Sequence, residues 1–424
     1  MPPRSARRAA PRRLRAPPAL VRGSEALPAS AILDELPGGV GVVLWSSARN
    51  VALWAATPPA RRGRLFDPAA GAAREAHLAA LEVDAELLAP LSVIVRLLED
   101  GGRMEEVRLV NACRRIALWA EQRGALGTAL EFAQCAALVA PEVAALAYAV
   151  GRLARRRAEY DRAETWLGRA VVQARRGNDW RTYALAYSGL GNVNVQKGNF
   201  PLGRRAHERC LKTAQRHNLR DLEGAAYHDL FAVALESGAD SDVDQLAQQA
   251  FVAYGPGHPN LPRLAFDVVF RWMQEGFFAD SLRVARVLTA HFATPCDQAL
   301  ALSMVARSAG GAGNVVTYED SRRRIAELGA SEIEDAASRV FLGLAHGAAS
   351  LSRWSLAREF ASAGLASARA RQEGRLILAA EALLKGIEER EAETARVSRP
   401  AAARLADQFI EALETSVPRA GVPA

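Results

Sequence analysis

The feature that most constrains the fold is internal repetition. The chain matches itself at one offset of 34 residues and then at repeated offsets of 40. The matched positions hold small residues, which two helices need where they pack closely. At an offset of 34 the matches are Ala117 with Gly151, Ala129 with Ala163 and Ala136 with Ala170; at 40 they are Gly151 with Gly191, Ala163 with Gly203 and Ala170 with Cys210. Periods of this length are typical of helix–turn–helix repeats.

Composition and turn signals favour the same structure. Ala, Leu and Arg dominate, and good helix formers fill nearly every window, so we expect an all-α protein. A turn signal lies midway through each unit, where one helix would end and the next begin. These signals are Gly124, Glu159-Tyr160, Gly198-Asn199 and Gly238-Ala239.

One unit, residues 186–214, resembles a tetratricopeptide repeat. Tyr187, Leu190 and Gly191 stand where that family has its first-helix aromatic residue, Leu and Gly. In the second half, Phe200 takes the place of the turn aromatic, while Gly203 and Cys210 take the places of the small residues. The 40-residue spacing is similar to the longer variant of the family. The resemblance implies an all-α, right-handed superhelical solenoid of helix–turn–helix repeats with a small N-terminal helical cap.

The chain divides into four expected parts. Residues 1–30 form an Arg/Pro/Ala-rich tail that we expect to be disordered, and residues 31–106 form the helical cap. The repeats span 107–392, and residues 393–424 add a short helix and a frayed tail. The seven arginines of residues 1–23 equal the whole formal net charge of +7, so the remainder of the chain is neutral. The basicity therefore belongs to the tail.

Several kinds of chemistry are excluded by spacing. None of the three lysines (Lys197, Lys212 and Lys385) follows a glycine, so no phosphate-binding Walker A loop exists. No two of the seven histidines stand three or four residues apart, as metal ligands on one helix face would. A G-x-S-x-G nucleophile motif is also missing. We therefore predict no catalytic residues, no metal, no cofactor and no enzymatic activity.

Cysteine usage and hydropathy indicate the compartment. The four cysteines are widely spaced, without a C-x-x-C pair, which is typical of a reducing compartment. No apolar run approaches the ~20 residues that cross a bilayer, and the Arg-rich tail lacks the apolar core of a signal peptide. We expect a bacterial-type cytoplasmic protein without a membrane partner.

The resemblance also implies a binding groove, because the first helix of each tetratricopeptide unit lines a concave surface. The side chains expected there are Arg114, Tyr148, Arg152, Arg155, Ser188, Asn192, Gln196 and His228. Asn192 matches an Asn common in the family, whereas the Lys/Asn clamp of chaperone-binding members is missing. Such a surface suits an acidic or extended peptide, since Arg can hold a carboxylate in bidentate fashion and amides can bond a peptide backbone. The other interpretation is that Arg152 and Arg155–Arg157 form a solvated basic ridge.

Two functions follow from these patterns. The first is a non-catalytic scaffold or adaptor that binds a peptide or protein segment in the concave groove. The alternative is a partner-sensing regulator whose Arg tail contacts nucleic acid. The sequence argues against nucleic acid, because residues 31–100 show no recognition helix with base-reading side chains on one face.

Overall fold

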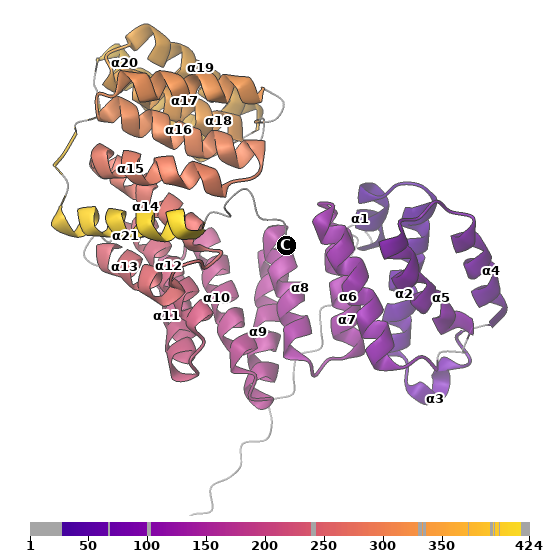
Figure 1. The fold of residues 1–424 in the computed structure, drawn as a ribbon. Helices are drawn as coiled ribbons and strands as arrows, with labels where there is room; N and C mark the ends of the chain where they lie inside the picture. The colour runs from indigo at the N-terminus through magenta and orange to yellow at the C-terminus, as the bar shows by residue number, and fades with distance from the viewer. Residues whose placement is uncertain are drawn as a thin grey trace, which may run out of the picture. The chain divides into compact units, whose positions relative to one another are not determined.

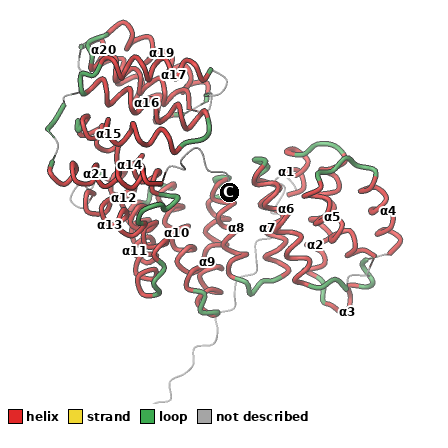
Figure 2. The backbone as a smooth tube through the Cα atoms, viewed as in Figure 1, coloured by secondary structure: helices red, strands yellow, loops and turns green. Residues whose placement is uncertain are grey.

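The computed structural model describes residues 28–66, 68–99, 103–238, 243–329, 333, 336–371, 373–390, 393, 395–397 and 399–416. Throughout these residues the regular elements are helices, with no strand (Figure 2). The all-α prediction is confirmed. Residues 1–27, most of the tail expected to be disordered, lie outside the described part, as do residues 417–424. The chain forms two compact units, residues 1–222 and 223–424, each of which is described by itself. The boundaries predicted at residues 30, 106 and 392 remain predictions.

The first unit begins with five helices and continues with three helix pairs (Figure 1). The five are α1 (Pro28–Glu35), α2 (Gly39–Ala56), α3 (Pro59–Arg62), α4 (Pro68–Ala79) and α5 (Ala85–Glu99). The pairs are α6 (Glu106–Gln122) with α7 (Leu126–Val139), α8 (Ala144–Arg156) with α9 (Tyr160–Arg176), and α10 (Trp180–Gln196) with α11 (Phe200–Arg216). Each helix of the pairs packs on the next, as a succession of helix–turn–helix repeats requires.

The small residues found by self-comparison lie where the paired helices meet. A Cβ atom on Gly151 would stand 2.6 Å from the Leu167 side chain, and one on Gly191 would stand 2.5 Å from the His207 ring. Both Leu167 and His207 are fully buried. The 40-residue offset between Gly151 and Gly191 is therefore also the offset between their packing partners. A glycine at each position lets the second helix of the pair approach.

The second unit continues the same pattern after α12 (Arg220–Ser237), which starts at the end of the first unit. Its other helices are α13 (Val243–Tyr254), α14 (Leu261–Glu275), α15 (Phe278–Leu288), α16 (Pro295–Gly311), α17 (Val315–Leu328), α18 (Ala337–Ser350), α19 (Trp354–Ala370), α20 (Gly374–Glu388) and α21 (Pro400–Ser416). The helix α21, yellow in Figure 1, returns across α13, α14 and α15. Its Leu405, Phe409 and Leu413 are buried in the core of this unit.

A left-handed residue marks the turn inside each pair. Its positive φ reverses the chain between the first and second helix. These turn residues are Gly124, Ala158, Gly198, Gly238, Gly276, Gly313 and Ser352, with φ values of 75°, 58°, 77°, 69°, 83°, 71° and 59°. The expected turns at Gly124 and Gly198 are confirmed, and so is the left-handed residue Gly238, whereas Ala239 lies outside the described residues. At the expected turn Glu159-Tyr160 the left-handed residue is the preceding Ala158. Asn199 and Asn314 follow their turn glycines and cap the next helix through their side chains.

Candidate binding face of the first helices

The turn residues give every first helix a common register. The residue seven positions before the turn packs inward, as Gly151, Gly191 and Ala306 do. Its neighbour, six positions before the turn, faces away from the pair. We call this the sixth position. Its occupants are Leu118, Arg152, Asn192, Ala232, Phe270, Arg307 and His346, and each is exposed or half-buried.

In the first unit, seven of the eight expected groove residues form stripes on three successive first helices. Arg114 is exposed on α6 and Gln196 is exposed on α10. Half-buried positions are held by Tyr148, Arg152 and Arg155 on α8, and by Ser188 and Asn192 on α10. Within each helix these residues are spaced three or four apart, so each set shares one helical face. We call the stripes of α6, α8 and α10 together the first-helix face.

Arg152 is not left free on this face, because it is bound to Glu121 of α6. The two carboxylate oxygens accept hydrogen bonds from Nη1 and Nη2 of Arg152, both at 2.6 Å, and Arg156 adds a third at 2.5 Å. The hydrogen bonds from Arg152 outweigh the opposing effect of burial and lower the pKa of Glu121. The bidentate pair joins the stripe of α8 to that of α6.

Sequence reasoning missed two residues of the face, Glu121 and Leu118. Leu118 is 56% exposed, which is high for a large apolar side chain. Arg114, Leu118 and Glu121 follow one another at spacings of four and three residues, so one stripe of α6 carries a cation, an apolar group and an anion. Stepping along the helix from Arg114 at these spacings would have found both residues.

His228, the eighth expected residue, belongs to the second unit. Its side chain is mostly buried on α12, where Nε2 lies 2.8 Å from Oδ2 of Asp267. Its Nδ1 lies 3.4 Å from the Tyr254 hydroxyl. Both partners belong to the helices that follow it. Its place in the expected groove remains a prediction.

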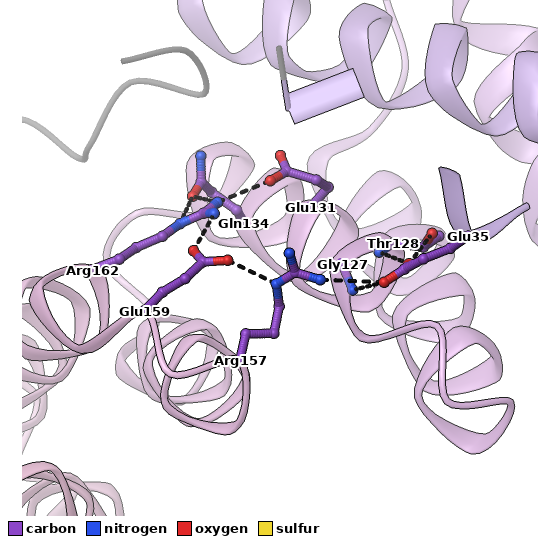
Figure 3. Close-up of polar contacts among 8 residues, drawn as sticks. All are labelled: Glu35, Gly127, Thr128, Glu131, Gln134, Arg157, Glu159 and Arg162. Carbon is purple, nitrogen blue, oxygen red and sulfur yellow. Dashed lines mark hydrogen bonds and ion pairs between the residues drawn. The ribbon is translucent and has the colours of Figure 1, made fainter. Parts of the chain in front are cut away.

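A second polar network lies beside the pairs of the first unit and binds Arg157, another arginine of the expected ridge (Figure 3). Arg157 donates to Glu159 over 2.7 Å and to Glu35 of α1 over 3.2 Å. Glu159 in turn accepts from Arg162 over 3.0 Å, and Arg162 reaches Glu131 over 3.1 Å. Burial raises the pKa of Glu131, opposed by the charge of Arg162. Arg152, Arg156 and Arg157 are thus all paired with carboxylates, and their side chains are 35%, 41% and 29% exposed. The interpretation as a solvated basic ridge stays a prediction.

Within the described residues no cluster of three or more His, Cys, Asp or Glu side chains could hold a metal ion. None of the helices in the same residues combines the length and the apolar character that a bilayer crossing demands.

Comparison with known proteins adds little to this geometry. No protein-family model matches the chain, and no curated protein sequence does. Among solved structures, similarity is found to the TPR2AB domain of yeast Sti1 in complex with pHSP90, at 12% identity and a TM-score of 0.27, over 66% of this chain and 98% of that one. A Rap protein complexed with competence and sporulation factor is similar at 10% identity and a TM-score of 0.36, over 81% of this chain and 98% of that one. TM-scores this low do not establish a family, so the tetratricopeptide assignment remains a resemblance of residues.

Proposed function

We propose that this chain is a non-catalytic scaffold whose first unit binds an acidic, extended segment of another protein on the first-helix face. The observation that carries the proposal is the register of the sixth position. In three successive pairs it presents Leu118, Arg152 and Asn192 away from the helix packing. An apolar group, a guanidinium and an amide are the groups that hold a side chain, a carboxylate and a peptide backbone.

The Arg152–Glu121 pair determines how a partner carboxylate can bind at the centre of this face. Two of the five N–H groups of Arg152 are used by Glu121, and a partner carboxylate either adds to the remaining ones or displaces Glu121. Arg114, exposed one turn before Leu118, offers a second cation. Because Leu118 is a large apolar side chain that is 56% exposed, we expect its burial by a partner to add to the affinity.

The location that we propose is the cytoplasm. All four cysteines are free thiols rather than disulfides, which fits a reducing compartment.

The test is differential capture by the full-length chain. Wild type, Leu118→Asp and Asn192→Ala are immobilised and exposed to lysate of the source cells, with and without nuclease treatment, and the retained proteins are quantified by mass spectrometry. The control is Leu202→Asp, since Leu202 is 45% exposed on the second helix α11. Proteins retained by wild type and Leu202→Asp but lost from both face variants support the proposal. Equal retention by all four chains contradicts it, and binding that disappears with nuclease points to nucleic acid instead.

A further inference from the structure

In the second unit, the side chains at the sixth positions of two neighbouring pairs bind a carboxylate from another part of the chain. Arg307 of α16 and His346 of α18 occupy these positions, as Arg152 and Asn192 do in the first unit. The carboxylate belongs to Glu393, between α20 and α21. Its Oε2 accepts from Nε of Arg307 at 3.2 Å, Oε1 accepts from Nη2, and Oε1 also lies 3.2 Å from Nδ1 of His346.

These three side chains are largely withdrawn from water. The Arg307 side chain is 13% exposed, and those of His346 and Glu393 are 25% and 26% exposed. Burial opposes the charge of Glu393, but the hydrogen bond and charge of His346 and those of Arg307 outweigh it and lower its pKa to about 2. Burial and the Arg307 charge lower the pKa of His346, whereas the hydrogen bond and the charge of Glu393 oppose this shift.

Residues 395–397, which follow Glu393, are less buried than α21. Residues 395–397 are exposed and have no regular structure, and Val397 is 93% exposed. The backbone N–H of Arg396 donates to the carbonyl of Gly276 at 2.8 Å. In α21, by contrast, Phe409 and Leu413 are fully buried. Release of Glu393 therefore leaves the apolar core of the unit covered.

Removal of Glu393 alone would leave a mostly buried guanidinium without a counter-charge, which is strongly unfavourable. Arg307 therefore requires some carboxylate. We propose that Arg307 and His346 form a second binding site for an acidic protein segment, that Glu393 fills this site as an internal ligand, and that a Glu or Asp of a partner protein takes its place. Glu393 thereby raises the affinity that a partner needs in order to bind, because the partner must compete with a tethered ligand whose effective concentration is about millimolar.

The test uses a synthetic peptide of residues 389–400, EREAETARVSRP, which carries Glu393. Calorimetric titration compares full-length wild type with Glu393→Gln, whose site lacks the internal carboxylate. We expect Glu393→Gln to bind the peptide at least about tenfold more tightly than wild type does. Binding should be lost when Glu393 is replaced by Gln in the peptide. It should also be lost when the protein carries Arg307→Met in addition to Glu393→Gln. The ring nitrogen resonances of His346 report occupancy directly and should return toward their wild-type positions as the peptide fills Glu393→Gln.

A second variant keeps the test decisive if Glu393→Gln is poorly folded by circular dichroism. Arg399 lies 5.4 Å from the centre of the Phe277 ring and 3.5 Å from Asp244. Arg399→Ala removes these two contacts and leaves Arg307, His346 and Glu393 unchanged. This variant should bind the peptide with an affinity between those of wild type and Glu393→Gln. Equal binding by wild type and the variants overturns the proposal, as does no binding by any of them. Free glutamate that binds as tightly as the peptide overturns the assignment to a protein segment.

Discussion

Glu35 and Thr128 lie 93 residues apart, yet one oxygen of the Glu35 carboxylate accepts both the backbone N–H and the hydroxyl of Thr128, at 2.7 and 2.9 Å. The other oxygen accepts the N–H of Gly127 at 2.7 Å. The carboxylate of α1 therefore caps the N-terminus of α7, where the first amides of a helix have no partner within it and the helix dipole favours an anion. The first helix of the described residues, α1, is in this way bonded to the first repeat.

Replacing Glu35 by Ala should lower the stability of the first unit by about 1–2 kcal/mol, the usual cost of a lost N-cap. For a unit of this size, that corresponds to a drop of roughly 2–8 °C in the thermal midpoint. Glu75→Ala on α4 is the matched control, because Glu75 is exposed and its loss should change stability by less than about 0.5 kcal/mol. Differential scanning calorimetry of the three chains makes the comparison. Equal midpoints for the two variants would show that the cap contributes nothing.

Two glycines in neighbouring helices should respond to alanine in opposite directions. At Gly191 the added Cβ would stand 2.5 Å from the His207 ring, so Gly191→Ala should cost about 1–3 kcal/mol. At Gly168 of α9 nothing lies within 4 Å of the added atom. There the higher helix propensity of Ala should raise stability by up to about 1 kcal/mol. Urea unfolding of both variants tests the register, and a loss at Gly168 as large as that at Gly191 would contradict it.

The stability that Glu393 contributes should depend on pH. Its pKa is lowered in the folded chain from 4.5 to about 2, so its charged form is favoured by folding. This stabilisation is fully present above the unfolded value and is lost as the pH falls through the folded one. The difference in thermal midpoint between wild type and Glu393→Gln should therefore be present near neutral pH and shrink as the pH falls below about 4.5 toward pH 2. A difference that stays constant down to pH 2 would mean that Glu393 is not paired in solution.

Thiol labelling should separate Cys296 from the other cysteines. Cys113, Cys135 and Cys210 are buried, whereas Cys296 is half-exposed. Burial also raises the pKa values of Cys113 and Cys135, so the reactive thiolate is suppressed at both. Iodoacetamide should modify Cys296 of the native chain roughly tenfold faster or more, and should reach the other three only in denaturant. Peptide mapping by mass spectrometry gives the rate at each cysteine, and equal native rates would contradict the packing of α6 and α7.

The sequence predicted what depends on local periodicity. The recurrence of a glycine at positions 151 and 191 predicted the helix pairs. The three-residue spacing between Arg152 and Arg155 predicted that the two arginines lie on one face of α8. Pairing between helices was less accessible. Whether Arg152 meets Glu121 depends on how the two helices are rotated about their axes, and no repeat in the sequence encodes that angle. The contact of Glu393 with Arg307 joins residues 86 apart through a segment without periodicity, so a repeat pattern contains no sign of it.

The register of the sixth position also implies how the chain can be shortened. Excision of residues 152–191 removes one full period and joins Gly151 directly to Asn192, so the fused helix keeps its phase and its turn at Gly198. Glu121 would then face an amide instead of a guanidinium. The shortened solenoid would still have a packed core, but its central carboxylate would lack a counter-ion, and its preferred partner would change from an acidic segment to a basic one.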